Sequence, residues 1–287
     1  MKKTLEKIRA VLYKPKEVRD VSNEPKTVDE ILDEQIKTGL GEYERSNRNL
    51  FFSALAAGLE IGFSLYVLAI IYTYLGDGDP ISLHFALAIG YPIGFVFVVL
   101  GRSELFTEQT TLAVLPVLNG NKTILNLLKL FGIIYFGNLL GGYIIGGLLV
   151  FLTPPLEVVD IEAFYHLAHK MIKFDAWIIF GSALLAGWLM GLLSWLVTSA
   201  QDTMSRIFIV IMITFVIGLG SLHHSIVGSI EVFAGLITSP KITWTDYFHF
   251  QFYTTIGNIV GGVLFVSIIK YASIDSKKSI ANSEDRR

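Results

Sequence analysis

Cysteine is absent from the 287 residues of the chain, which excludes disulfide bonds, thiolate metal sites and cysteine nucleophiles. Charged residues are also scarce, at 17% of the chain with a formal net charge of −2, whereas soluble domains carry about 25%. A chain with this net charge lacks the excess of basic residues typical of nucleic-acid binding, so no nucleic-acid partner is expected. No signal peptide is indicated, because a polar segment, 1–49, precedes the first apolar run.

Long apolar runs make up most of the remaining sequence, and 52% of the residues are hydrophobic. Each run reaches the length of about 20 residues that crosses a hydrocarbon core roughly 30 Å thick. The predicted spans are 50–74, 81–100 (continuing to about 118), 124–151, 176–198, 207–237 and 246–272. We therefore expect an all-α, multi-pass protein of the cell membrane, with an N-terminal segment (1–49), a six-span domain (50–272) and a tail (273–287).

The distribution of Lys and Arg predicts the orientation. The N-terminal segment holds 11 of the 23 Lys and Arg residues, and the second and fourth connectors and the tail are also basic. The first connector has none, and the third and fifth have only Lys170, Lys173 and Lys241. By the positive-inside rule, both termini are expected in the cytoplasm.

Two amphipathic segments lie outside the spans. Residues 28–37 are interpreted as a surface helix on the channel body or the membrane, with a regulatory plug as the alternative. Residues 156–173 predict an external amphipathic helix. It carries His166 and His169 three positions apart, but no further His or Cys lies nearby, so no metal site is predicted. No cofactor is expected.

Two matching motifs indicate an internal repeat. Gly-Asn-x-x-Gly-Gly occurs at 137–142 in the third span and again at 257–262 in the sixth, with Asn138 and Asn258 at the same place. The small residues allow close helix approach. The second and fifth spans are each interrupted by polar residues, at 101–111 and 218–225. Three spans per half require the halves to be inverted, and matching breaks in inverted halves point to a solute site near the membrane midplane.

The residues around these breaks resemble the formate/nitrite transporter family over roughly residues 28–272. The specific pieces are Leu-Phe-Thr at 105–107 after an acidic residue, His-Ser-Ile at 224–226, and the two Gly-Asn-x-x-Gly-Gly motifs. The Trp-rich run 188–195 adds weaker support. The resemblance implies an aquaporin-like fold, a homopentamer in the lipid bilayer, and one pore per protomer for small monovalent anions.

The resemblance also implies roles for individual residues. His224 corresponds to the family's central pore histidine and Thr107 to its hydroxyl partner. Leu105 and Phe106 correspond to the inner constriction, and Asn258 to the family's Asn of the sixth span. His223 is interpreted as structural, because it points about 100° away from His224 on a helix.

This sequence departs from the family pattern at several positions. Gly187 and Gly228 stand where the family usually has Asn, His223 stands where an acidic residue often precedes the central His, and one residue is added between Gly101 and Leu105. These changes alter the hydrogen-bonding shell of the His–Thr pair, so the substrate is less well determined than the fold.

The charged residues inside the predicted spans include Glu60, Arg102, Glu104 and Glu231. An ionised carboxylate facing lipid at the midplane costs at least about 2.5 kcal/mol. We interpret them as a buried network in which Arg102 neutralises Glu60 or Glu231. The alternatives are a part for Glu60 or Glu231 in proton handling, or a place near the interface.

The predicted function is a proton-linked channel or transporter for small monovalent anions or their weak acids, and not an enzyme. The sequence leaves open whether His224 itself carries the proton or sets the field in which water donates it. An aquaporin-like neutral-solute channel is the first alternative, but no Asn-Pro-Ala motif is present. An intramembrane enzyme lacks ligand-spaced partners for His224. A non-transporting scaffold is the third alternative.

Overall fold

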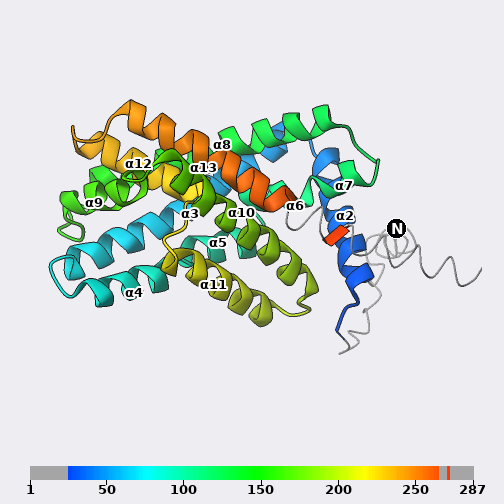
Figure 1. The fold of residues 1–287 in the computed structure, drawn as a ribbon, viewed down its shortest axis with the longest axis horizontal. Helices are drawn as coiled ribbons and strands as arrows, with labels where there is room; N and C mark the ends of the chain where they lie inside the picture. Colours follow the sequence, from blue (N-terminus) through cyan, green and yellow to red (C-terminus); the bar gives the residue numbers. More distant parts are fainter. Residues whose placement is uncertain (1–24, 265–269, 272–287) are drawn as a thin grey trace, which may run out of the picture.

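The computed structural model describes residues 25–264 and 270–271, and within them the chain is a bundle of helices without strands (Figure 1). Two short helices mark the opposite ends of the bundle: α2 (Val28–Glu44) lies at one end and α9 (Ile161–Ile172) at the other. Both were expected outside the spans. The predicted tail and part of the predicted sixth span lie outside the described residues.

Of the six predicted spans, four are unbroken helices over the described residues and two are interrupted. The unbroken spans are α3 (Asn47–Leu75), α8 (Ile124–Leu152), α10 (Ala176–Ser199) and α13 (Trp244–Gly262). The second span consists of α4 (Pro80–Gly90), α5 (Ile93–Gly101), α6 (Phe106–Leu112) and α7 (Leu115–Leu118). The fifth consists of α11 (Thr203–Leu219) and α12 (Ser225–Thr238). The two longest interruptions, 102–105 and 220–224, fall within the polar stretches that predicted them, and the shorter ones at 91–92 and 113–114 were not predicted.

Four helical stretches are long and apolar enough to cross a membrane by themselves: α3, α4 with α5, α8 and α10. In the fifth span, the break divides the apolar sequence into two shorter apolar helices. Large apolar side chains such as Phe136, Phe151, Trp177 and Phe208 are exposed on the outside of the bundle. A soluble protein rarely exposes so much apolar surface, and a bilayer covers it. The chain is a multi-pass membrane protein.

Polar caps fix where the helices begin. Five of the six predicted spans start after a residue whose side chain accepts a hydrogen bond from the backbone N–H of the first turn, which satisfies a donor that has no partner in the helix. These capping residues are Ser46, Asp79, Thr123, Asp202 and Thr243. Each is exposed or partly exposed, so the caps mark the ends of the spans.

The two breaks have the same backbone design. Arg102 ends α5 with φ 56°, and Ser221 follows α11 with φ 48°. Each left-handed residue turns the chain so that the next N–H bonds a carbonyl five residues back: Ser103 N to Val98 O at 3.1 Å, and Leu222 N to Ile217 O at 3.0 Å. This is a helix-ending turn of the Schellman type. The fold therefore repeats the break itself, as the inverted repeat predicts.

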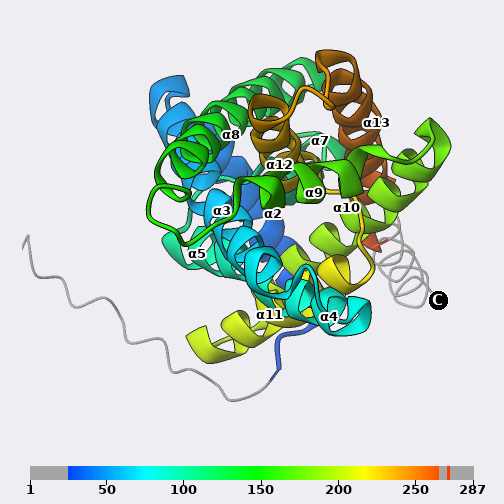
Figure 2. The ribbon, with the colours of Figure 1, turned by 90° about the vertical axis from the view of Figure 1, so that its left-hand side faces the viewer.

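The glycine motifs bring pairs of spans into close contact. α3 packs along α8, and α10 packs along α13 in the other half (Figure 2). A Cβ atom at Gly141 would lie 2.2 Å from the carbonyl oxygen of Leu55, and one at Gly261 would lie 2.0 Å from that of Leu184. Only glycine allows this approach.

α2 is attached to the body of the bundle. Gln35 is fully buried, and its amide nitrogen lies 3.3 Å from the hydroxyls of Ser194 and Thr198 on α10. The hydroxyl of Tyr43 donates to the Ala113 carbonyl at 2.6 Å. The contacts agree with the prediction of a surface helix that lies on the channel body.

Candidate functional site

The site is built where the two half-helices α6 and α12 begin. Leu105 is the N-cap residue of α6 and His224 is that of α12, so the two halves of the repeat present different side chains at the same position. Both residues are buried, with exposed fractions of 1%. Helix N-termini carry partial positive charge, and both of these lie inside the bundle.

Asn138 and Asn258 hold the two half-helix starts in the same way. The side-chain oxygen of Asn138 accepts from Phe106 N at 2.7 Å, and its nitrogen donates to the carbonyls of Ala54 and Glu104. Asn258 repeats the pattern in the other half: Ser225 N donates to its oxygen at 2.8 Å, and its nitrogen donates to the carbonyls of Ala183 and His223. Each Asn therefore satisfies backbone groups that the break leaves without partners. These bonds are those of a structural brace.

Thr107 and His224 meet at the centre of the bundle, with the threonine hydroxyl 2.8 Å from His224 Nε2. The Val227 N–H donates to the other ring nitrogen, Nδ1, at 3.3 Å. A nitrogen that accepts carries no proton, so the proton of the neutral ring is on Nε2, which donates to Thr107. The pairing of these residues from opposite halves was predicted from the inverted repeat and the family resemblance.

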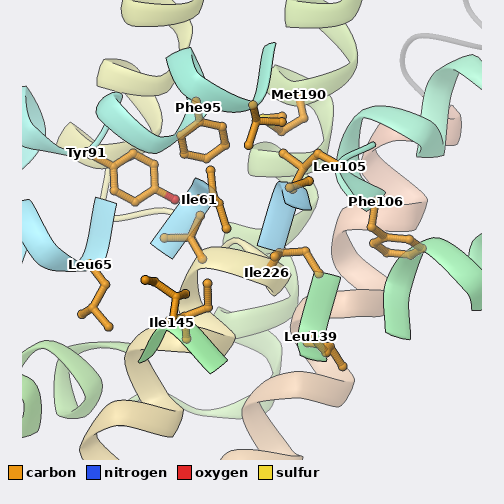
Figure 3. Close-up of a cluster of buried hydrophobic side chains, with 14 of the residues drawn as sticks. Ile61, Leu65, Tyr91, Phe95, Leu105, Phe106, Leu139, Ile145, Met190 and Ile226 are labelled. Atoms are coloured by element: carbon orange, nitrogen blue, oxygen red, sulfur yellow. The ribbon is translucent and has the colours of Figure 1, made fainter. Parts of the chain in front are cut away.

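Apolar side chains surround the His–Thr pair. The ring of Phe95 meets the His224 ring edge to face, with centroids 5.2 Å apart. Leu105, Met190 and Ile226 belong to the same buried cluster (Figure 3). A narrow apolar passage of this kind excludes a hydrated ion, since removing the water from a charge is very costly.

Phe106 belongs to the same buried cluster but lies on its α8 side. Its ring packs against Phe131 and Tyr135 of α8, with centroid distances of 5.4 and 4.9 Å, and Figure 3 shows it turned away from Phe95 and Leu105. The constriction of Leu105 with Phe106 therefore stays a prediction. Leu105, the N-cap residue of α6, points inward. Phe106 is the next residue, and the turn of the helix directs its side chain toward α8.

A small cavity opens beside His224 toward the α9 end of the bundle, with about 30 Å³ of space for water-sized molecules. This volume suffices for a small molecule or a water. Its polar lining includes His224, Lys170 of α9 and Glu231 of α12. Partial burial lowers the pKa of the Lys170 ammonium, and the Glu231 carboxylate opposes that shift. Lys170 was predicted only as a charge of the third connector, and the amphipathic pattern of 156–173 is the one signal that could have placed it beside this cavity.

Glu104 forms an ion pair that was not predicted. The structure pairs it with Arg45, whose guanidinium lies 2.6 Å from one carboxylate oxygen and also 2.7 Å from Glu42. The other oxygen accepts from Gln109 at 2.5 Å. Arg102 is exposed and has no ion pair within the described ranges. The predicted pairing of Arg102 with Glu60 or Glu231 is wrong, because the left-handed turn directs Arg102 outward.

Glu60 lies beside the first break. A Cβ atom at Gly101 would be 3.1 Å from one of its carboxylate oxygens, and its side chain hydrogen-bonds Ser103. The second carboxylate oxygen has no hydrogen-bond partner in the described part of the chain. Glu60 therefore braces the turn after α5 and has no part in an ion pair there.

The ion pair of Arg45 leads to a prediction about stability. Arg45→Ala is expected to destabilise the protein by roughly 1–3 kcal/mol, since it leaves the mostly buried Glu104 carboxylate without its counter-charge. Arg102→Ala is the matched control and should change little. Thermal unfolding in detergent measures both. Adding Glu104→Gln to Arg45→Ala should restore much of the loss, and equal losses for the Arg45 and Arg102 variants would contradict the assignment.

His223 is held away from the centre. Its Nδ1 lies 2.8 Å from the Ser182 hydroxyl and its Nε2 lies 3.0 Å from the Met171 carbonyl oxygen. Both ring nitrogens are thus occupied by neighbouring helices, as a structural role requires.

The two glycines that depart from the family pattern are both tightly packed. A Cβ atom at Gly187 would lie 2.3 Å from the Asn258 carbonyl oxygen, and one at Gly228 would lie 2.4 Å from the Phe250 ring. In this structure, no longer side chain fits at either position. Among the described residues, no group of three His, Cys, Asp or Glu side chains could hold a metal ion.

Comparisons with known proteins decide the family. The model of the formate/nitrite transporter family matches residues 29–272. The chain belongs to the formate/nitrite transporter family. The protein is therefore a membrane transporter or channel and not an enzyme. It is 33% identical over 254 residues to the inner membrane protein YfdC of Escherichia coli (strain K12), a match that covers 87% of this chain and 79% of YfdC. It is 24% identical over 246 residues to the formate-nitrite transporter of Plasmodium knowlesi (strain H), covering 81% and 78% of the two chains.

Solved structures support the same fold for this transporter. An ion channel of the family superposes with a TM-score of 0.77 at 21% identity, covering 85% of this chain and 99% of the other. A pentameric formate channel with formate bound superposes with a TM-score of 0.69 at 18% identity, covering 79% and 97%. The predicted all-α, aquaporin-like architecture is confirmed.

Proposed function

We propose that this transporter moves small monovalent anions across the membrane in the form of their weak acids, with His224 at the central point of the path. The observation that carries the proposal is the Thr107–His224 contact of 2.8 Å between the two half-helix starts. It is the polar pair within a buried apolar cluster, where a passing molecule needs a hydrogen-bonding group.

The energetics favour a neutral passenger. An anion that enters a narrow apolar passage loses its water without receiving enough hydrogen bonds in return. Addition of one proton turns a carboxylate or nitrite into a neutral acid and removes most of this cost. A neutral acid still needs a hydrogen-bond partner, and the His224–Thr107 pair can donate to it or accept from it.

The proposal extends to assembly and orientation. The solved formate channel with formate bound is pentameric, and we propose the same assembly here. The E. coli relative is named an inner membrane protein, which supports a place in the cell membrane. The Lys and Arg distribution supports cytoplasmic termini, so that the α9 end of the bundle and its cavity face outward.

Flux measurements with a panel of acids test the function. Purified protein in liposomes is expected to carry formate and nitrite, and acetate or lactate more slowly, because the cavity near His224 is small. Uptake should increase as the outside pH falls from 8 to 5, since the protonated fraction rises. Radiolabelled uptake measures the flux, and empty liposomes are the control. The panel consists of formate, nitrite, acetate, lactate and hydrosulfide. Absence of flux for all of them would favour the alternative of a non-transporting scaffold.

A further inference from the structure

Glu231 is the charged side chain of the outer cavity that the fold itself does not explain. It is 4% exposed, it lines the cavity beside His224, and no hydrogen bond or ion pair joins it to another described residue. A buried carboxylate without partners is costly. We interpret the cost of burying Glu231 as a sign that its carboxyl group acts on a molecule that enters the cavity.

The internal repeat shows that the fold does not require an acid at this position. His224 and Leu105 are the equivalent N-cap residues of the two halves. By the same difference in residue number, the equivalent of Glu231 is Leu112, which is buried in the other half. An apolar side chain packs there on an equivalent half-helix. The carboxyl group of Glu231 is therefore an addition on the α9 side of the site.

Three titratable groups face Glu231 from the elements around it. Lys170 comes from α9, the Tyr91 hydroxyl comes from the join of α4 and α5, and His224 lies two turns away at the start of α12 itself. The Lys170 ammonium lies beyond the 4.0 Å of an ion pair with Glu231. The cavity that both groups line has about 30 Å³ of space for water-sized molecules.

We propose that Glu231 is the proton donor of the outer cavity: it protonates the incoming weak-acid anion there, before the molecule reaches His224. This proposal rests on the proposed function. The anion enters with its charge next to Lys170. The O–H bond of the neutral Glu231 carboxyl breaks, and its proton bonds to an oxygen of the substrate. The products are the neutral acid and a Glu231 carboxylate, whose charge Lys170 then balances. A proton from the outer solution restores the carboxyl.

The contacts of His224 explain why a second group supplies the proton. The Val227 N–H occupies Nδ1, and Nε2 is directed at Thr107. A protonated ring would lose the bond from Val227, and it would place a full charge at the positive end of α12. His224 is suited to bind the neutral acid, and Glu231 to form it.

Glu231→Gln in full-length protein in liposomes tests the proposal, with radiolabelled formate as the probe. The amide keeps the shape and loses the transferable proton. Formate uptake at outside pH 7 should fall about tenfold, a modest general-acid contribution. At pH 5 the variant should approach wild type, because the solution then supplies more protonated acid. Lys170→Met should instead raise the half-saturating formate concentration, since it removes the attraction for the anion.

Two further variants make the outcome decisive. Glu231→Leu copies Leu112 of the other half, so it should fold and show the same loss at pH 7 even if the Gln variant folds poorly. Glu162→Gln, an exposed change on α9, is the matched control and should behave as wild type. Unchanged formate flux and pH dependence in both Glu231 variants would overturn the proposal. Failure of wild type to carry any acid would instead overturn the proposed function.

Discussion

Replacement of His224 by Phe is expected to reduce weak-acid flux to the level of empty liposomes while the assembly stays intact. Phenylalanine has a similar shape and packs well beside Phe95, whose ring already meets His224 edge to face. Phenylalanine provides no hydrogen bond to Thr107 or to a passing acid. A neutral acid would then find no hydrogen-bonding side chain at position 224 within the apolar cluster. The Val227 N–H also loses its side-chain acceptor, which costs about 1 kcal/mol of stability.

Two smaller changes separate the functions of the ring. His224→Asn keeps a hydrogen-bonding side chain and an N-cap acceptor for α12, but it removes the imidazole that pairs with Thr107. We expect reduced, residual flux that keeps the pH dependence of wild type. Thr107→Val removes the hydroxyl that accepts the hydrogen bond from the Nε2–H of His224, so flux should weaken without vanishing. Uptake from pH 5 to 8 for wild type and the three variants measures this, with size-exclusion chromatography as the control for assembly. Unchanged flux and pH dependence in His224→Phe would falsify the central role of His224.

The sequence predicted the parts of the fold that rest on local rules. Apolar runs of membrane length predicted the spans, and polar stretches at 101–111 and 218–225 predicted the breaks. The repeated Gly-Asn-x-x-Gly-Gly motif predicted close helix packing, and the structure adds the reason for Asn138 and Asn258: each bonds backbone groups that the adjacent break leaves unpaired.

The directions of the side chains near the breaks could not be predicted from the sequence. The left-handed turn at Arg102 directs that side chain outward, and no periodicity rule covers a residue outside a regular helix. Arg45 precedes α3, and its approach to Glu104 depends on how α2 docks on the bundle. Phe106 shares a motif with Leu105, but one helical step takes its ring to α8. The cavity lining likewise required α9 to be placed over α12 before Lys170 could be associated with Glu231.

The comparison of the two halves separates structural from functional residues. The halves share what the break needs, namely a left-handed residue, an Asn brace and close-packed glycines. They differ where a substrate would pass: His224 against Leu105, and Glu231 against Leu112. The two halves thus place different side chains at two equivalent positions along the proposed path, so the path is asymmetric although the scaffold is nearly symmetric.

Gly141→Leu and Gly261→Leu are expected to prevent assembly of a stable protein. At Gly141 the first added carbon would lie 2.2 Å from the Leu55 carbonyl oxygen, and at Gly261 2.0 Å from that of Leu184. Backbone atoms cannot rotate out of the way as a side chain can, so α8 would have to separate from α3, or α13 from α10. Overpacking of this severity costs about 3 kcal/mol or more.

Separation of these helices would also disturb the site, since Asn138 and Asn258 donate across the same contacts to the carbonyls of Ala54 and Ala183. The matched controls are Gly147→Leu on α8 and Gly181→Leu on α10, where an added Cβ meets no atom within 4 Å. Size-exclusion chromatography and thermal unfolding in detergent measure all four variants. The controls should elute and unfold as wild type does, whereas the Gly141 and Gly261 variants should aggregate or unfold at a much lower temperature. Normal elution and flux in either of those two would show that close packing of α3 on α8, or of α10 on α13, is not what holds the half-helix starts in place.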